Sequence, residues 1–260
     1  MTVAGQRILI TGGGSGIGRA TALALARLGA TVAILDCNME QLRKTASEIA
    51  EIGLAPLVLV GDIRFEEQVK EAARTVQGQW GRLDGLFSNA GINGIWAPLD
   101  QIEAEEWDAT FNVNLRGTFL VLKYFIPQLK VTGGSIVITS STVGNFVFSN
   151  LGSTAYGCTK AALVSLGKQL ALELAEHHIR VNVVCPGPIG TTIAQTTSRR
   201  GLESCRIAAK LANGYPPLTD GVAGAPEDVA EVVTFLMGNG ARFITGAEIV
   251  IDGGNFLIKG

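Results

Sequence analysis

Short apolar runs alternate along this chain with longer amphipathic stretches. The apolar runs are rich in Ile, Val and Leu and lack polar alternation, which is typical of strands buried on both faces of a parallel sheet. They predict strands at residues 7–11, 31–35, 56–60, 83–88, 134–139, 179–184 and 247–251.

Between these runs, apolar residues recur at helical spacing, for example at Leu163, Leu166, Leu170 and Leu174. Alternating strands and helices predict an α/β fold: a three-layer α/β/α, Rossmann-like, doubly wound sheet of seven mostly parallel strands. No linker or repeat interrupts the pattern, so we expect residues 1–260 to form a single domain. Residues 191–224 form a long stretch without strand character, and we expect a substrate lid with short helices there.

Composition narrows the class of protein. The chain has 260 residues and a net charge of −2. It has no run of basic residues, so we do not expect nucleic acid as a partner. No apolar run approaches the roughly 20 residues that a membrane span needs, so we predict no membrane partner and a cytoplasmic location. The adjacent His177 and His178 would point in different directions on a helix and could not bind one metal ion together. The cysteines are widely spaced, so no metal or disulfide site is expected from Cys37, Cys158, Cys185 and Cys205.

A glycine-rich turn follows the first predicted strand, in the sequence TGGGSGIG that begins at Thr11. Backbone N–H groups at a helix N-terminus favour a pyrophosphate, and glycines let the backbone approach it. A plain glycine turn is the alternative. The predicted cofactor contacts here are Gly12, Ser15, Gly16, Ile17 and Gly18.

Two acids follow the next predicted strands. Asp36 can accept both adenosine ribose hydroxyls and would repel a 2′-phosphate, and its uncharged neighbours Ser15 and Cys37 offer no cation. NAD is therefore favoured over NADP. Asp62 could accept the adenine amino group while Ile63 packs on the ring. A solvated acid is the alternative reading for both carboxylates.

The candidate reaction centre lies in the second half of the chain. Tyr156 and Lys160 are one helical turn apart, so the ammonium would lower a phenol pKa that is ordinarily about 10, and would also reach the nicotinamide ribose. Tyr156 would then serve as acid or base. Ser140-Ser141 ends a predicted strand, and we choose Ser141 as the member that bonds the substrate oxygen. Taken singly, Tyr156 could be a packed aromatic residue, Lys160 a solvated side chain, and the two serines turn or helix-cap residues.

These motifs resemble the short-chain dehydrogenase/reductase family over nearly the whole chain. Ser88-Asn89-Ala90-Gly91 resembles its N-N-A-G turn, and Asn112-Val113-Asn114-Leu115 resembles its catalytic asparagine motif. The resemblance implies a tetrad of Asn114, Ser141, Tyr156 and Lys160, in which Asn114 holds a relay water behind Lys160. It also implies cofactor contacts at Asn89, Ala90, Gly91, Tyr156, Lys160, Pro186, Gly187, Ile189 and Thr191.

Two departures from the family pattern affect the interpretation. Ser88 replaces the first asparagine of N-N-A-G, a residue that supports the sheet. The segment between Ser141 and Tyr156 is slightly long, with the extra length near residues 145–150, where the substrate pocket is expected. Four aromatic residues could be pocket walls or core: Trp96, Phe146, Phe148 and Tyr215.

We therefore predict an oxidoreductase that transfers a hydride between NAD(H) and the CH–OH or C=O group of a small substrate. The alternatives are a catalytically silent NAD-sensing or scaffold protein on the same fold, and an epimerase or dehydratase on a related fold. The apolar end of residues 245–260 needs a covering surface. In the family, this segment pairs with its copy across one two-fold axis, and two long helices pair across another. Here those helices would lie near residues 105–130 and 156–176, so the resemblance implies a homotetramer.

Overall fold

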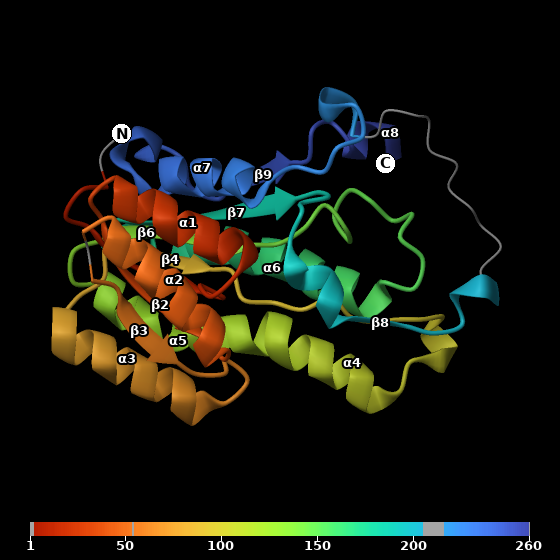
Figure 1. Cartoon of the computed structure of the whole chain (residues 1–260), viewed down its shortest axis with the longest axis horizontal. Helices are drawn as coiled ribbons and strands as arrows, with labels where there is room; N and C mark the ends of the chain where they lie inside the picture. Colours follow the sequence, from red (N-terminus) through yellow and green to blue (C-terminus); the bar gives the residue numbers. More distant parts are fainter. Residues whose placement is uncertain (1–2, 54, 205–215, 260) are drawn as a thin grey trace.

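A seven-stranded, wholly parallel sheet forms the centre of the molecule (Figure 1). The computed structural model describes residues 3–53, 55–204 and 216–259. The strand order is β3-β2-β1-β4-β6-β7-β9. The bounds are β1 Arg7–Thr11, β2 Thr31–Asp36, β3 Leu57–Val60, β4 Gly85–Ser88, β6 Gly134–Thr139, β7 Ile179–Pro186 and β9 Glu248–Ile251. The predicted fold class and all seven predicted strands are confirmed, with small shifts at their ends.

Helices cover both faces of the sheet. One buried apolar cluster joins the sheet to α1 (Gly16–Arg27), α2 (Met39–Glu51) and α7 (Pro226–Met237), and α1 and α7 lie side by side in Figure 1. A second cluster joins the opposite face to α3 (Glu66–Trp80), α5 (Thr118–Leu129) and α6 (Thr154–Glu173). The strands are apolar on both faces because each face meets one of these clusters.

The register of the sheet brings the functional segments to one edge. Thr11 pairs with Leu35, and Ser88 pairs with Ile138, so the carboxyl ends of β1, β2, β4 and β6 are aligned. The chain order reverses between β1 and β4, which pair directly. Open α/β sheets bind ligands at such a switch point, outside the carboxyl ends of the strands.

A small second sheet was not predicted. Strand β5 (Gly94–Trp96) pairs in parallel with β8 (Thr197–Arg199), which lies inside the expected lid. Strands of three residues leave no periodic pattern in the sequence. The described part of residues 191–224 also contains the expected short helices, Thr192–Thr196, Leu202–Ser204 and Pro217–Thr219. Cys205 and Tyr215 lie outside the described residues.

The long helix expected at residues 105–130 is interrupted. It consists of α4 (Ala104–Phe111), a π-helical segment (Asn112–Gly117) and α5. The wider π turn contains Asn114, whose carbonyl accepts a hydrogen bond of 2.8 Å from the Thr118 hydroxyl. Such segments occur often at functional sites. The remaining α-helix, α8, is short (Phe256–Lys259). None of the described helices combines the length and apolar character that crossing a bilayer requires.

Candidate active site

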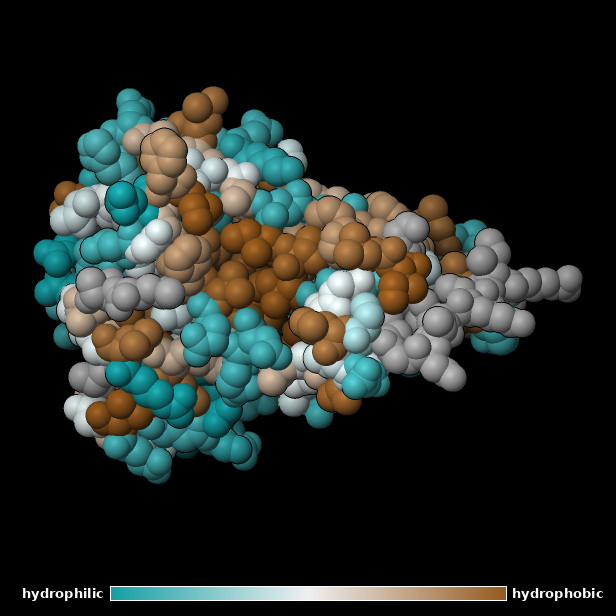
Figure 2. Space-filling view, turned by 90° about the horizontal axis from the view of Figure 1, so that it is seen from above, coloured by the Kyte–Doolittle hydropathy of each residue, from teal (hydrophilic) through white to brown (hydrophobic). Residues whose placement is uncertain are grey.

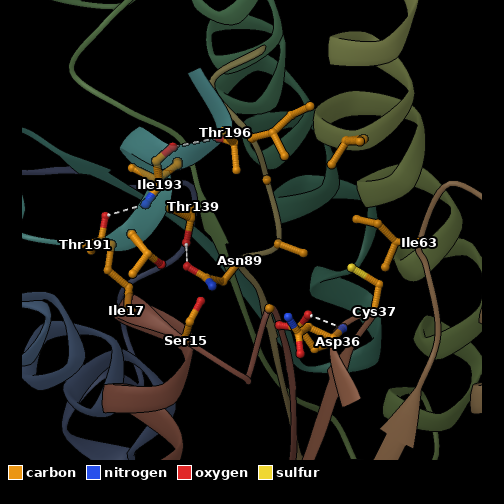
Figure 3. A pocket seen from close by; sticks show the side chains of 18 of the residues that line it. Ser15, Ile17, Asp36, Cys37, Ile63, Asn89, Thr139, Thr191, Ile193 and Thr196 are labelled. Atoms are coloured by element: carbon orange, nitrogen blue, oxygen red, sulfur yellow. Dashed lines mark hydrogen bonds between the residues drawn. The ribbon is translucent and has the colours of Figure 1, made fainter. Parts of the chain in front are cut away.

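A cavity of about 520 Å³ opens at the carboxyl edge of the sheet. Figure 3 shows the 191–204 segment on one wall, with Thr191, Ile193 and Thr196, and the glycine turn and strand ends on the other. The cavity is lined by nearly all the predicted cofactor contacts: Gly12, Ser15, Gly16, Ile17, Asp36, Asp62, Ile63, Asn89, Ala90, Gly91, Tyr156, Lys160, Pro186, Gly187, Ile189 and Thr191. Residues far apart in the sequence are therefore brought to one site.

The glycine turn is shaped to accept an anion. The first turn of α1 has no acidic residue, and the Ser15 side chain does not cap it, so its backbone N–H groups remain available. Gly12 has a φ of 66°, and a Cβ there would come within 3.0 Å of the Ala90 Cα. These features fit the pyrophosphate of a dinucleotide, which needs both free donors and close backbone approach.

Gly18 was predicted to contact the cofactor, but it does not line the cavity. A Cβ at this position would lie 2.1 Å from the Gly12 carbonyl oxygen. Gly18 therefore allows α1 to pack closely against the turn, and its influence on a ligand is indirect.

Asp36 lines the cavity at the place where the sequence predicts an adenosine ribose. Its Oδ2 accepts a hydrogen bond from the Gly14 N–H at 3.1 Å, and its Oδ1 accepts one from the Asn38 N–H at 3.0 Å (Figure 3). These bonds fix the carboxylate while leaving further lone pairs for ribose hydroxyls. The expectation that no cation lies nearby needs correction, because Arg64 lines the same cavity.

The Asp62 carboxylate is engaged within the protein. Arg64 Nη2 lies 2.6 Å from Asp62 Oδ2, and the Arg64 backbone N–H donates to Oδ1 at 2.9 Å. Burial alone would raise the pKa of Asp62, but the hydrogen bonds and charge of Arg64 lower it. Arg64 follows Asp62 so closely in the chain that the sequence contained the signal for this pair.

The turn at Asn89 is anchored to two strands. The Thr11 hydroxyl accepts hydrogen bonds from the Asn89 N–H at 2.9 Å and the Ala90 N–H at 3.1 Å. The Thr139 hydroxyl donates to Asn89 Oδ1 at 3.1 Å, as Figure 3 shows. The substituted Ser88 is buried at the end of β4. Sequence reasoning assigned no role to Thr11 or Thr139, although each ends a strand directly before the site.

Tyr156, Ser141 and Lys160 form a buried group at the inner end of the cavity. The Ser141 hydroxyl hydrogen-bonds to the Tyr156 phenol, and the Val143 N–H donates to Ser141 Oγ at 3.1 Å. Lys160 Nζ lies 5.5 Å from the centre of the Tyr156 ring and donates to the Thr139 carbonyl at 2.9 Å. The helix α6 places Tyr156 and Lys160 on one face, as their spacing predicted.

The pKa values of this group differ from the expectation. Burial raises the pKa of Tyr156, and the Ser141 hydrogen bond opposes this only in part. Burial also lowers the pKa of Lys160 to about 8. The predicted lowering of the phenol pKa by Lys160 is therefore not seen, because the ammonium lies over the ring and bonds to Thr139 while both groups are desolvated.

Asn114 lies behind this group and does not line the cavity. Its Nδ2 donates to the Ile92 carbonyl at 2.9 Å and to the Thr159 hydroxyl at 3.1 Å, while its Oδ1 accepts the Ile92 N–H at 2.8 Å. A Cβ on Gly91 would lie 3.1 Å from Asn114 Oδ1 and 3.5 Å from Lys160 Nζ. Gly91 therefore sits between the two polar groups that the predicted relay would join.

Sequence comparison agrees with this geometry. A family model described as enoyl-(acyl carrier protein) reductase matches residues 12–255. The chain is 38% identical over 257 residues to the 3-oxoacyl-(acyl-carrier-protein) reductase FabG of Thermotoga maritima, covering 98% of this chain and 99% of that protein. The chain belongs to the short-chain dehydrogenase/reductase family. It is thus an NAD(P)-dependent oxidoreductase that acts on a CH–OH or C=O group.

Solved structures of this family match along almost the whole chain. A crystal structure of a 3-ketoacyl-(acyl-carrier-protein) reductase from Sinorhizobium meliloti is 47% identical, with a TM-score of 0.92, covering 96% of this chain and 99% of that one. A Brucella melitensis reductase of the same name, complexed with NADH, is 30% identical, with a TM-score of 0.85 and coverage of 98% and 100%.

Within this short-chain dehydrogenase/reductase site, Asn145 is a supporting residue that sequence reasoning did not single out. Its Nδ2 donates to Ser140 Oγ at 3.1 Å and to the Ser141 carbonyl at 2.8 Å. Ser140 Oγ donates in turn to the Lys160 carbonyl at 2.7 Å. Through Asn145, the slightly long segment before α6 therefore holds both serines in place, and Ser140 links them to the backbone of Lys160.

The three described aromatic residues that were candidates for pocket wall or core do not line the cavity. Phe148 is 73% exposed, Phe146 packs against Phe256, and Trp96 lies in β5. The cavity is instead completed on the substrate side by smaller or polar side chains, which are Ile92, Val113, Ile193, Gln195 and Thr196. Among the described residues, no His, Cys, Asp and Glu group is arranged to hold a metal ion.

Proposed function

We propose that this chain is an NAD(H)-dependent ketoreductase in which Tyr156 exchanges a proton with the substrate oxygen. The observation that carries the proposal is the buried Tyr156 phenol, bonded to Ser141 and flanked by Lys160, at the inner end of the cavity that starts at the glycine turn. The alternative of a silent NAD-binding protein has no supporting feature in this site.

In the reductive direction, Tyr156 donates its proton to the carbonyl oxygen as that oxygen gains electron density. When bound in this cavity, a reduced nicotinamide would supply the hydride for the carbonyl carbon. Burial raises the pKa of the phenol, so Tyr156 carries the proton at neutral pH but releases it less readily than an ordinary phenol. Ser141, fixed by the Val143 N–H, orients the reacting oxygen.

Lys160 and Asn114 act behind the phenol. Lys160 lines the cavity and bonds to Thr139, so it is placed to hold a ribose hydroxyl. Asn114, anchored to Ile92 and Thr159, holds the far side of the relay through which Tyr156 regains its proton. The hydrogen bonds to Ile92 and Thr159 keep the Asn114 amide in one orientation.

Asp36 supports NAD over NADP. Its carboxylate is fixed at the adenosine end, where it accepts ribose hydroxyls and repels a 2′-phosphate. The Arg64 charge is already paired with Asp62 and does not offset this repulsion. The Brucella melitensis relative, which is complexed with NADH, agrees with this choice.

The cavity supports a substrate with an extended, partly apolar chain rather than a stacked ring, because Tyr156 is the one aromatic side chain among the described residues that line it. The three relatives with acyl-carrier-protein names make 3-oxoacyl thioesters the first class to test.

The deciding experiment follows NADH absorbance with 3-oxoacyl thioesters, cyclic ketones and secondary alcohols, each with NAD(H) and NADP(H). We expect turnover with NAD(H), and a shift of kcat/KM toward NADP(H) in the variant Asp36→Ala/Cys37→Arg. Equal kcat/KM of the unmodified protein with both cofactors contradicts the NAD preference. Cofactor binding without turnover on any substrate class contradicts the ketoreductase.

We also propose that the chain works as a single domain with residues 191–224 as lid, and as a cytoplasmic homotetramer. Apolar side chains gather on the face shown in Figure 2, which lies above α7, β9 and α8 in Figure 1. Exposed apolar residues near this face include Leu218, Leu257 and Ile258. A solution mass near four times the 27.2 kDa chain supports the tetramer, and a mass near 27.2 kDa contradicts any oligomer.

A further inference from the structure

One polar side chain on the substrate side of the cavity is uncommitted. Three of the side chains there are apolar, which are Ile92, Val113 and Ile193. The Thr196 hydroxyl is fully engaged, because it accepts the Asn93 N–H at 3.0 Å and donates to the Ile193 carbonyl at 2.7 Å. Gln195 is exposed and lines the cavity, and across the described part of the chain its side-chain amide makes no hydrogen bond. This amide is therefore available to a ligand.

The short helix Thr192–Thr196 determines which way Gln195 faces. It is a 3-10 helix, in which the side chains at positions i and i+3 eclipse one another. Gln195 therefore follows Thr192 along one edge, and both line the cavity, whereas the intervening Ala194 does not. At a rise of about 2 Å per residue, Gln195 lies about 6 Å beyond Thr192 along the helix axis. Since the helix begins next to Thr191, a predicted cofactor contact, Gln195 lies past the cofactor.

An amide in this place can recognise a second oxygen of the substrate. Tyr156 and Ser141 are bonded to each other at the inner end, where the reacting oxygen is proposed to bind. A further carbonyl oxygen on the substrate chain needs a donor of its own, which the apolar side chains around it do not offer. Gln195 Nε2 carries two N–H donors and can supply one.

We infer that Gln195 is a specificity-determining residue that favours ketones with a second carbonyl oxygen, such as 3-oxoacyl esters and thioesters, over ketones without one. The inference rests on the proposed ketoreductase function and names the residue that recognises the acyl carbonyl. Because Gln195 is exposed, its amide bonds to water in the free enzyme, and the net gain is that of one ordinary hydrogen bond. We therefore expect a preference of about threefold to tenfold, far below the roughly 10⁴-fold selectivity of a buried polar site.

The test compares ethyl acetoacetate with its ether analogue, in which a CH₂ group replaces the ester carbonyl. The quantity measured is the ratio of their kcat/KM values with NADH, because comparing this ratio between variants cancels the different intrinsic reactivity of the two ketones. Gln195→Met keeps the length of the side chain and removes its donors, so the ratio should fall by about threefold to tenfold. Gln195→Glu keeps the shape but offers only acceptors at neutral pH, so the ratio should fall at least as far.

The matched control is Gln79→Met on α3, an exposed glutamine outside the cavity, which should leave the ratio unchanged. An unchanged ratio in Gln195→Met overturns the inference, even if turnover of both ketones falls, because a residue that only shapes the segment affects both alike. If Gln195→Met fails to fold, the ratio in Gln195→Glu decides in the same way. If the unmodified protein reduces neither ketone, the inference is overturned, and turnover of cyclic ketones or secondary alcohols then decides whether the ketoreductase function also fails.

Discussion

The inner end of the cavity and the 191–204 segment that borders it are held by different kinds of contact. At the inner end, Tyr156, Lys160 and Asn114 are at most 8% exposed. Lys160 bonds to the Thr139 carbonyl in β6, and Asn114 bonds to the Ile92 carbonyl after β4. The 191–204 segment is held by side chains on the surface, such as Arg200, which pairs with Glu106 at 2.7 Å. The first region is a fixed scaffold, whereas local opening of the second costs little free energy.

The 191–204 segment is nevertheless better anchored than its composition suggested. The Asn93 N–H donates to Thr196 Oγ1 at 3.0 Å, and Asn93 Nδ2 donates to Thr197 Oγ1 at 2.8 Å. The Arg200 N–H donates to the Trp96 carbonyl at 3.1 Å, next to the β5·β8 pairing. Its order without ligand therefore depends on a small parallel sheet and a few polar contacts, and not on an apolar core.

The largest expected effect lies at the inner end. Tyr156→Phe removes the phenol proton while keeping the packed ring, so turnover should fall by about 10²–10⁴-fold, the usual loss of general acid–base catalysis. The dissociation constant for NADH should stay nearly unchanged, because Ser141 and Lys160 keep their other partners. Steady-state kinetics and fluorescence titration measure the two quantities. Turnover within a few-fold of the unmodified enzyme rules out the proton-transfer role.

The second effect is a pH dependence of stability at the inner end. The native pKa of Lys160 is lowered to about 8, whereas the unfolded value is near 10.5. Between these values the unfolded state binds more protons, so the free energy of unfolding should rise with pH. The expected contribution of Lys160 is about 2 kcal/mol from pH 7 to 9.5.

Lys160→Met supplies the comparison, because it retains Tyr156 and Cys185, whose raised pKa values act in the opposite direction at higher pH. Urea unfolding of both proteins without cofactor, at several pH values, isolates the Lys160 contribution. A difference in unfolding free energy that stays constant from pH 7 to 9.5 contradicts a lowered lysine pKa.

The smallest effect belongs to the 191–204 segment. Arg200→Ala removes a partly exposed ion pair with Glu106, so it should change global stability only slightly. Hydrogen exchange at residues 196–204 should become faster, and saturating NADH with a substrate analogue should slow it again. Arg74→Ala, which breaks another exposed pair, is the control. Unchanged exchange in Arg200→Ala shows that the Glu106 ion pair does not hold the segment, and leaves that role to the β5·β8 pairing and the Asn93 hydrogen bonds.

The same contrast explains what the sequence could predict. The strands of the large sheet carry a continuous apolar signal, and the glycine turn, Tyr156 and Lys160 stand in short local motifs. Their placement in one cavity followed from the parallel sheet, whose carboxyl ends share an edge.

The missed features depend on contacts between distant residues. The pairing of β5 with β8 and the bracing of Ser140 by Asn145 leave no periodic trace. The raised pKa of Tyr156 follows from how completely the fold buries it, which spacing on a helix does not reveal. The Asp62–Arg64 pair was readable in the sequence, because its partners are almost adjacent.

The double hydrogen bond between Asn114 and Ile92 has a consequence for engineering this enzyme. Ile92 directly precedes Asn93, whose N–H and side chain bond to Thr196 and Thr197. A directed-evolution library that retains Thr196 and Thr197 can vary Ile193 and Gln195, which line the cavity, while the Asn114 amide keeps its anchor at Ile92. A library that also randomises Thr196 and Thr197 removes the hydrogen-bond partners of Asn93 and can displace Ile92 and Asn114. Improved variants should therefore be more frequent in the first library.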